Sequence, residues 1–344
     1  LGIITVYGIP EVAKIREAVF RDGYTFANMD QKVKQLYEHE ASYYSFGWSH
    51  GKEKLQGHPD YSKGSFYNNP LCNQPFENKE MITKFPSFAT PNVWPHKELP
   101  SLEKNFMAAG KLIVKVGTLI AKRCDEYIES KCQNYQKGRL HKMISENKVC
   151  KARLLHYYPV EEAKTSKSTE ESSDPFGNWC GWHNDHSSLT GLMVGQFVDT
   201  KTNKFIKSPD PAAGLYIRSR KGKLLKVKLP QDEKIHVGNT LLFQIGESSQ
   251  IHSGGLLQAT PHAVRGANVP GVSRESYAVF MQPKMDELMD VPKGINAKDA
   301  QSAQAEEQLP TGVPTLSSRY GTKNCPFTSC NYAAFTAESL AAYH

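Results

Sequence analysis

Two histidines and one aspartate in this chain have the types and spacing to bind a ferrous ion. His183 and Asp185 lie two positions apart, and His262 follows much later in the chain. Two imidazoles and one carboxylate on a single face of Fe(II) leave adjacent coordination positions open, where a co-substrate and O₂ bind together. The sequence therefore predicts a non-haem Fe(II) site made by His183, Asp185 and His262.

An arginine and a hydroxyl residue that follow His262 indicate what the co-substrate is. Arg274 and Ser276 are two positions apart, so on a strand both side chains point to the same side. A guanidinium and a hydroxyl placed in this way can hold one carboxylate between them. This pattern favours a 2-oxo acid that chelates the iron while its far carboxylate lies on Arg274 and Ser276.

A second His-x-Asp, at His58 and Asp60, tests how specific the first one is. The chain has 12 histidines, so one copy by chance is expected. His58 lies in a turn-like segment, with a proline between the two side chains and no strand pattern beside it. Residues 189–198, by contrast, form an apolar, partly β-branched run that follows His183, as a buried strand requires. We therefore expect no metal at His58. We also expect that His186, three residues after His183, is not a ligand.

The composition is that of a globular protein rather than a membrane or nucleic-acid-binding one. Of 344 residues 39% are hydrophobic, the mean hydropathy is −0.53, and no stretch approaches the ~20 apolar residues that span a bilayer. The net charge is +7, and the densest basic stretch, residues 218–228, is predicted to form a hairpin around Lys221-Gly222. No aromatic residues alternate with these charges, so we expect a solvated face and no nucleic-acid partner.

The cysteines show no metal-binding or redox motif. None of the seven is part of a CxxC or a paired zinc spacing, and an odd number at wide separations is typical of reduced thiols in a reducing compartment. We expect structural or incidental roles for Cys72, Cys124, Cys132, Cys150, Cys180, Cys325 and Cys330.

The first 150 residues are predicted to be mostly helical. One helix is expected from Pro10 to Gly23, and a second pattern covers 29–44. Residues 45–100 are rich in Gly, Pro, Asn and aromatic residues and are predicted to be a long irregular segment. Ser101 can cap a long helix with an apolar side.

Strand patterns dominate the region 151–285. Many short strands separated by turn residues favour a closed or double-sheet β fold. We expect a mobile loop at 160–178, and a C-terminal extension, 286–344, that wraps around the core, all in one domain. The strands are predicted at 153–158, 189–198, 214–219, 223–229, 239–245, 254–259 and 274–281.

At this point the sequence resembles the isopenicillin N synthase-like (clavaminate synthase-like) family of Fe(II)/2-oxoglutarate-dependent dioxygenases, and more closely a branch found in plants and protists. The resemblance covers nearly the whole chain. It is carried by the runs Phe46–Lys54, Lys63–Tyr67, Trp182–His186 and Pro209–Tyr216.

The resemblance implies a fold and a set of site residues. The fold is mainly β with flanking α, a double-stranded β-helix (jelly roll) core with the N-terminal helices outside one sheet. Arg274 and Ser276 match the residues that bind the C5 carboxylate of 2-oxoglutarate, and Tyr158 matches a tyrosine that helps to hold it. The motif match assigns the iron to His183, Asp185 and His262.

For other residues near these motifs the resemblance does not decide the role. His156 replaces the Asn commonly found before Tyr-Tyr-Pro, and the long interval between the two metal histidines implies an inserted hairpin. Trp182, Phe176 and Trp48 are candidates to line the substrate pocket, against an alternative of structural packing. Tyr157 is expected to pack in the core on the face opposite Tyr158.

The predicted activity is an oxidation, most simply a hydroxylation, of a small-molecule substrate with release of succinate and CO₂. Fe(II) and 2-oxoglutarate are the expected cofactor and co-substrate, and ascorbate is a supporting reductant. An isopenicillin synthase-type oxidase that needs no 2-oxo acid is one alternative, and a non-catalytic binding protein on the same fold is another. A zinc hydrolase leaves Arg274 and Ser276 unexplained.

The remaining expectations concern partners and location. We expect a monomer with no membrane partner. Leu1 is not an initiator Met and no targeting pattern follows it, so we expect a cytoplasmic protein and leave open a native N-terminus upstream.

Overall fold

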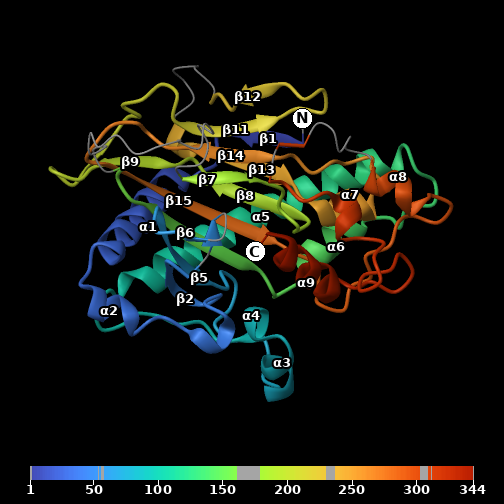
Figure 1. Ribbon diagram of the computed structural model, residues 1–344, viewed down its shortest axis with the longest axis horizontal. Helices are drawn as coiled ribbons and strands as arrows, with labels where there is room; N and C mark the ends of the chain where they lie inside the picture. The colour runs from blue at the N-terminus through green and yellow to red at the C-terminus, as the bar shows by residue number, and fades with distance from the viewer. Residues whose placement is uncertain are drawn as a thin grey trace.

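The computed structural model describes residues 2–52, 54–55, 58–160, 179–229, 237–302, 309–310 and 312–343. Within these ranges the strands form two antiparallel sheets and one short separate pair (Figure 1). The larger sheet has the order β1 (Ile3–Val6), β13 (Leu241–Ile245), β8 (Leu189–Met193), β15 (Val272–Met281), β6 (Lys151–Tyr157), β5 (Lys63–Asn68), β2 (Gly47–His50).

Two further strands attach to this sheet, and the second sheet is smaller. In the larger sheet β9 (Gln196–Asp199) pairs with β15 and with β10 (Lys204–Ile206). The smaller sheet has the order β12 (Leu224–Lys226), β11 (Gly214–Arg218), β14 (His262–Arg265), β7 (Cys180–His183). The separate pair is β3 (Lys54–Leu55) with β4 (His58–Pro59).

Helices cover the outside of the larger sheet. The long helix α5 (Ser101–Glu129) and α1 (Val12–Ala27) pack on β6, β8 and β15, and their apolar sides form the main core (Figure 1). The other helices are α2 (Gln31–Gln35), α3 (Lys79–Lys84), α4 (Pro86–Ala89), α6 (Arg139–Glu146), α7 (Glu247–His252), α8 (Ala297–Gln301), α9 (Tyr332–Tyr343), η1 (Glu40–Ser42), η2 (Val237–Asn239) and η4 (Leu316–Ser318). No helix among the described residues has the length and apolarity to cross a membrane.

The coarse prediction of mainly antiparallel strands with flanking helices is confirmed, but several elements differ. The helix expected to end at Gly23 continues to Ala27. The irregular segment 45–100 contains β2 and β5, which extend the larger sheet through β6. The strand predicted at 254–259 is wrong, because Gly254 and Gly255 have φ of 63° and 85° in a turn after α7.

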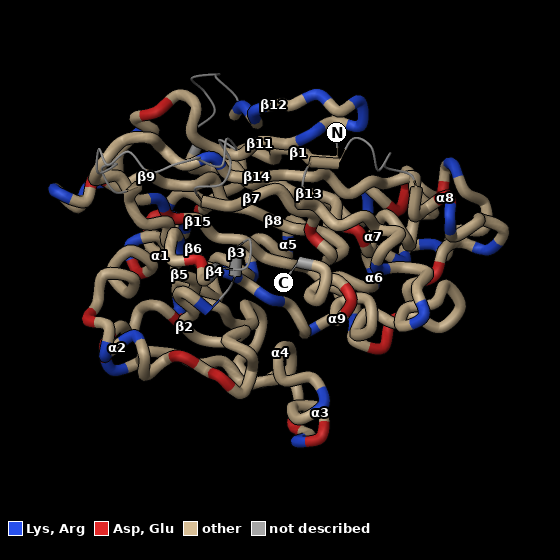
Figure 2. Tube along the Cα trace, viewed as in Figure 1, with Lys and Arg blue, Asp and Glu red and all other residues tan. Residues whose placement is uncertain are grey.

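The basic stretch forms the predicted hairpin. Strands β11 and β12 pair around a turn in which the Gly222 amide donates to the Ser219 carbonyl. Figure 2 shows lysines and arginines along this hairpin, where Lys221 and Lys223 are exposed. Arg220 and Lys228 are exposed as well, as expected of a solvated face, whereas Arg218 and Lys226 are half-buried.

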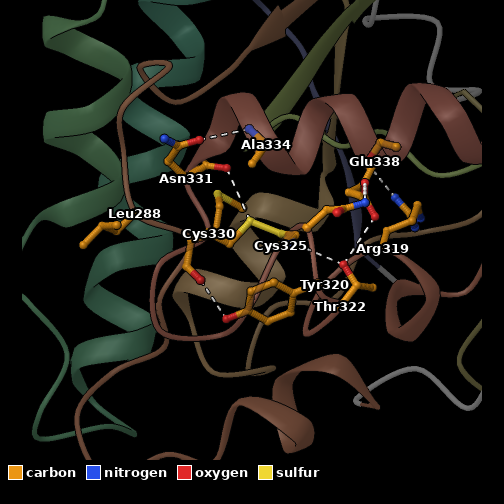
Figure 3. The surroundings of a disulfide bond; sticks show 12 residues. Leu288, Arg319, Tyr320, Thr322, Cys325, Cys330, Asn331, Ala334 and Glu338 are labelled. Carbon is orange, nitrogen blue, oxygen red and sulfur yellow. Dashed lines mark hydrogen bonds between the residues drawn. A yellow bond between two sulfur atoms is a disulfide. The ribbon is translucent and has the colours of Figure 1, made fainter.

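The C-terminal segment has a core of its own that is closed by a disulfide. Cys325 and Cys330 are bonded, so the expectation that all seven cysteines are reduced is wrong for this pair. The Thr322 hydroxyl accepts from the Cys325 amide and donates to Glu338 of α9, which ties the disulfide loop to that helix (Figure 3). Met285, Met289, Leu316, Tyr320, Tyr332 and Phe335 surround the loop and pack on Ile251 of α7.

The absence of a side chain at Gly191 lets α5 approach β8 closely. A Cβ there would lie 2.3 Å from Cγ2 of Ile113. We predict that Gly191→Val lowers the free energy of unfolding by about 1–3 kcal/mol, as overpacking does. Urea unfolding of Gly191→Val, Ile113→Ala and the double variant measures this. Because Ile113→Ala makes room, the double variant should lose less stability than the sum of the two single losses, and simple additivity would contradict the close approach.

Candidate metal centre and cavity

The smaller sheet brings the two predicted metal histidines together. His262 of β14 pairs directly with His183 of β7, and their ring centroids are 4.1 Å apart. Asp185 follows β7 in the loop before β8, with Oδ1 3.8 Å from Nε2 of His183 and Oδ2 3.8 Å from Nε2 of His262. One ligand atom from each residue lies within 4.8 Å of the others. These three side chains therefore converge on one point.

Backbone contacts orient both imidazoles for metal binding. Nδ1 of His183 lies 2.9 Å from the Gly181 carbonyl, and Nδ1 of His262 lies 3.0 Å from the Thr260 carbonyl. Such contacts fix the tautomer that leaves Nε2 available to a metal. Oδ2 of Asp185 is buried with no hydrogen-bond partner among the described residues. A buried carboxylate oxygen left in this way fits a divalent cation.

The charges in this cluster are strongly coupled. Burial and the neighbouring His183 lower the pKa of His262 to about 4. Burial alone would raise the pKa of Asp185, but the two imidazoles lower it. Burial opposes ionisation of His183, yet Cys180 and Asp185 raise its pKa to about 9. Asp185 and His262 are thus in the forms that ligate metals at neutral pH, whereas His183 carries a proton that metal binding must displace.

A cavity of about 920 Å³ lies between the two sheets and includes the three residues. The smaller sheet contributes His183, His262 and Leu215 to its wall. The larger sheet contributes Arg274 and Ser276 of β15 from across the cavity. The two sets of residues predicted from sequence therefore line one cavity. Its apolar wall includes Leu155, Leu192, Met193, Phe197, Phe205, Ile206, Val227 and Phe280.

Arg274 is a buried cation in this cavity. It is 8% exposed, and its Nη1 has no hydrogen-bond partner among the described residues. Burial lowers the pKa of Arg274, and its Cζ lies 5.3 Å from the ring centroid of Tyr157, opposite it on β6. A Cβ at Gly195 would meet Nη2 of Arg274 at 2.3 Å, so a larger residue there would force the guanidinium to move. A buried guanidinium nitrogen without a partner fits an anionic ligand.

Sequence reasoning missed Arg16, another of the basic residues that line the cavity. Its Nε donates to the Val194 carbonyl at 2.6 Å, and its Nη2 donates to the Gly195 carbonyl at 3.1 Å. Burial and the nearby Arg274 lower the pKa of Arg16 to about 10. The sequence could have indicated that Arg16 faces the interior. It lies four residues after Val12 and three before Val19, on the buried side of the predicted helix.

Cys180 is a cavity residue for which only an incidental role was expected. Its Sγ lies 3.8 Å from Nδ1 of His183. Burial would raise the pKa of this thiol, but the His183 imidazole lowers it to about 7. The thiol therefore belongs to the electrostatic surroundings of the metal-binding residues.

The structure does not bring Tyr158 to this cavity. Arg153, Leu155 and Tyr157 of β6 line it, so the alternation of the strand turns the next side chain away. The hydroxyl of Tyr158 lies 3.4 Å from the Ala27 carbonyl of α1, and its ring packs on His156. The expected positions of Tyr157 and Tyr158 are thus exchanged.

Neither tryptophan proposed for the substrate pocket lines this cavity. Trp48 is 2% exposed and packs in the main core beside Phe26, which corrects its assignment. Trp182 lies against Arg218, whose Cζ is 6.0 Å from its ring centroid. The third candidate, Phe176, lies outside the described residues, as do residues 161–178 of the expected loop.

Two residues that could be metal ligands on sequence grounds, Asp60 and His186, make other contacts in the structure. Asp60 accepts from the Ser62 amide at 2.9 Å and pairs with Lys63, as a turn residue does. The ring of His186 lies 6.0 Å from that of Tyr332 in α9 and is not part of the converging group.

Comparison with solved structures finds a similar fold in proteins described as 2OG-Fe(II) oxygenases. No protein-family model and no curated protein matches the sequence. A Caulobacter crescentus protein assigned to the 2OG-Fe(II) oxygenase family has a TM-score of 0.65 and 16% identity, over 100% of this chain and 90% of its own.

Two other similar structures contain bound 2-oxoglutarate. A full-length Neurospora crassa protein in complex with alpha-KG and thymine has a TM-score of 0.63 and 18% identity, over 100% of this chain and 88% of its own. The Arabidopsis thaliana dioxygenase for auxin oxidation 1, in its 2-oxoglutarate complex, has a TM-score of 0.55 and 15% identity, over 86% and 88%. At such identities the similarity shows a shared fold.

The geometry predicts which His-x-Asp binds metal. We expect Asp185→Ala to weaken Fe(II) binding by more than the roughly 10- to 100-fold typical of residues that only orient ligands. Asp60→Ala is the matched control and should keep wild-type affinity, because Asp60 contacts Ser62 and Lys63. Anaerobic titration with Fe(II) measures both. Loss of binding in Asp60→Ala alone would show that the metal lies elsewhere.

Proposed function

We propose that this protein is a non-haem Fe(II)- and 2-oxoglutarate-dependent oxygenase that oxidises a small molecule. One observation carries the proposal. Across a single cavity, the converging His183, Asp185 and His262 face a buried Arg274 whose Nη1 has no partner among the described residues. A metal fits the first group and a carboxylate fits the second, and 2-oxoglutarate has a metal-chelating end for the one and a free carboxylate for the other.

The proposed roles follow from the contacts of each residue. When bound, Fe(II) and 2-oxoglutarate supply the oxidising chemistry, with release of succinate and CO₂. His183, Asp185 and His262 would hold the metal at the wall of the cavity, where it would be accessible to the co-substrate. Hydroxylation is the simplest outcome for a C–H bond held there.

The residues of the larger sheet hold the far carboxylate in this proposal. Arg274 provides the guanidinium, and Ser276, on the same side of β15, provides a hydroxyl. We assign the supporting tyrosine role to Tyr157, because it faces Arg274 across the β6–β15 pair. Tyr158 is turned toward α1 and does not take part.

The remaining cavity accommodates the substrate. Aliphatic and aromatic side chains form much of the wall, which keeps water from the reacting centre. The similarity in fold supports a double-stranded β-helix core, and we propose membership of the isopenicillin N synthase-like branch on the sequence motifs described above.

The proposal predicts a specific loss of co-substrate binding in Arg274 variants. Truncation leaves the 2-oxoglutarate carboxylate desolvated and unpaired, so Arg274→Ala should weaken binding by about 2–5 kcal/mol. Arg274→Lys should restore only part of the 2-oxoglutarate affinity, since an ammonium cannot form two parallel hydrogen bonds to a carboxylate. Calorimetry under anaerobic conditions with an inert divalent metal measures this.

The control is Arg218→Ala, which removes a guanidinium outside the cavity and should leave 2-oxoglutarate affinity unchanged. If Arg274 were only a structural cation, Arg274→Ala would change stability and leave 2-oxoglutarate affinity at the wild-type value. That result would contradict the assignment.

The proposal also predicts activity without a substrate. With Fe(II), ascorbate and 2-oxoglutarate, the protein should form succinate slowly, because the co-substrate chelates metal beside an open position. Succinate measured over time should be absent in Asp185→Ala. No succinate from wild type, together with no 2-oxoglutarate binding, would favour the oxidase or binding-protein alternative.

A further inference from the structure

A buried ion pair joins the C-terminal segment to the region beside the metal-binding residues. The side chains of Arg319 and Glu247 are each 1% exposed. Nη1 donates to Oε2 at 2.7 Å and Nη2 donates to Oε1 at 2.6 Å, so the contact is bidentate. Glu247 begins α7, and Arg319 follows η4, in the region around the disulfide shown in Figure 3.

Glu247 contacts both residues that follow His183. The Asn184 side-chain amide donates to Oε1 of Glu247 at 3.2 Å, and the Glu247 backbone amide donates to the Asp185 carbonyl at 2.8 Å. The next residue of α7 continues the contact, because the Ser248 hydroxyl donates to the His186 carbonyl at 2.6 Å. The start of α7 therefore lies directly on the loop that carries the metal-binding carboxylate.

The arginine is itself held in place by several acceptors. Its Nε donates to the Thr315 carbonyl at 3.3 Å, and its Nη2 donates to the Pro314 carbonyl at 3.2 Å. Its Nη1 also donates to the Ser339 hydroxyl of α9 at 3.0 Å. These contacts come from both sides of the loop that the Cys325–Cys330 disulfide closes. The guanidinium is thus a fixed point rather than a mobile side chain.

A buried ion pair is a poor way to stabilise a fold. Removing two charges from water costs several kcal/mol each, and well-packed apolar residues often stabilise as much. Such a pair does fix the orientation of its carboxylate. A carboxylate held by two hydrogen bonds presents its remaining lone pairs at a defined position. Here a remaining lone pair of Glu247 meets Asn184, between the two metal-binding residues of the loop.

We propose that Glu247 and Arg319 are positioning residues for the metal site. Arg319 fixes the Glu247 carboxylate, and this carboxylate fixes Asn184 and with it the loop that presents Asp185 to His183 and His262. The inference rests on the proposed function, since it takes these three residues as the metal ligands. It assigns the C-terminal segment a part in metal binding although none of the described residues of that segment is a ligand.

Binding of Co(II), a spectroscopic substitute for Fe(II), tests the proposal without any turnover. Its visible absorption reports the geometry of the ligands, which a merely structural role of the ion pair would leave unchanged. The test variants are Asn184→Leu, which leaves the ion pair intact, and the double variant Glu247→Leu/Arg319→Met, which replaces it by apolar groups. Thermal unfolding of each variant reports whether the fold is kept.

The matched control is Arg139→Met. Arg139 is also largely buried, with Nη2 3.0 Å from Glu287 and 2.6 Å from Asp290 of the C-terminal segment. These contacts do not include the metal loop, so the control removes an arginine from another ion pair of the C-terminal segment, whose partners Glu287 and Asp290 are 31% and 51% exposed. It should retain the wild-type affinity for Co(II) and the wild-type spectrum.

We expect both test variants to bind Co(II) about 10- to 100-fold more weakly, the range for residues that orient metal ligands, with an altered spectrum. Unchanged affinity and spectrum in both would overturn the inference, and so would an equal loss in Arg139→Met. If the double variant does not fold, Asn184→Leu alone decides. A wild-type protein that binds no Co(II) would overturn the proposed function itself, whereas wild-type binding with unchanged variants overturns only the positioning role.

Discussion

The pairing of β14 with β7 is the constraint on which the site depends. It sets His262 directly opposite His183, and a shift of one residue would turn one imidazole out of the cavity. Because the smaller sheet carries both histidines, the larger sheet is free to carry the groups that face them. Arg274 lies on β15, in the middle of that sheet, where neighbouring strands on both sides limit its movement. Two rigid sheets thus hold two different binding groups at a fixed separation.

The cavity between the sheets contains buried charged atoms that have no hydrogen-bond partner among the described residues. Oδ2 of Asp185 and Nη1 of Arg274 are both buried without a hydrogen-bond partner among the described residues, and each such group costs free energy in the folded protein. Arg16 adds a second cation near Arg274, which increases the cost further. A metal ion beside Asp185 and a carboxylate beside Arg274 would relieve both costs. The electrostatic cost of these buried groups and the proposed binding of a metal and a carboxylate therefore have the same origin.

The sequence was informative where function depends on residue type and order, and less so where it depends on register and long-range pairing. It indicated the residues that the two sheets bring together, because His-x-Asp, His and Arg-x-Ser each adjoin strand patterns. It misplaced Tyr157 and Tyr158, since one residue of register decides which face of β6 each occupies. Strand β5 was missed because its pairing with β6, rather than any local preference, makes it a strand. Arg319 had no signal, because nothing in the sequence connects it to Glu247.

The Arg319–Glu247 pair shows why the loop after β7 needs support from outside the sheets. The backbone ladder fixes His183 and His262, but Asp185 lies beyond the end of β7, where no strand partner remains among the described residues. Its position must come from contacts made by other elements, and α7 makes them through backbone and side-chain groups. A helix as short as α7 is not stable alone, so it depends on the C-terminal core that packs on Ile251 and on the Arg319 pair. The carboxylate of the metal site is therefore only as well placed as the C-terminal segment that supports it from more than a hundred residues away in the sequence.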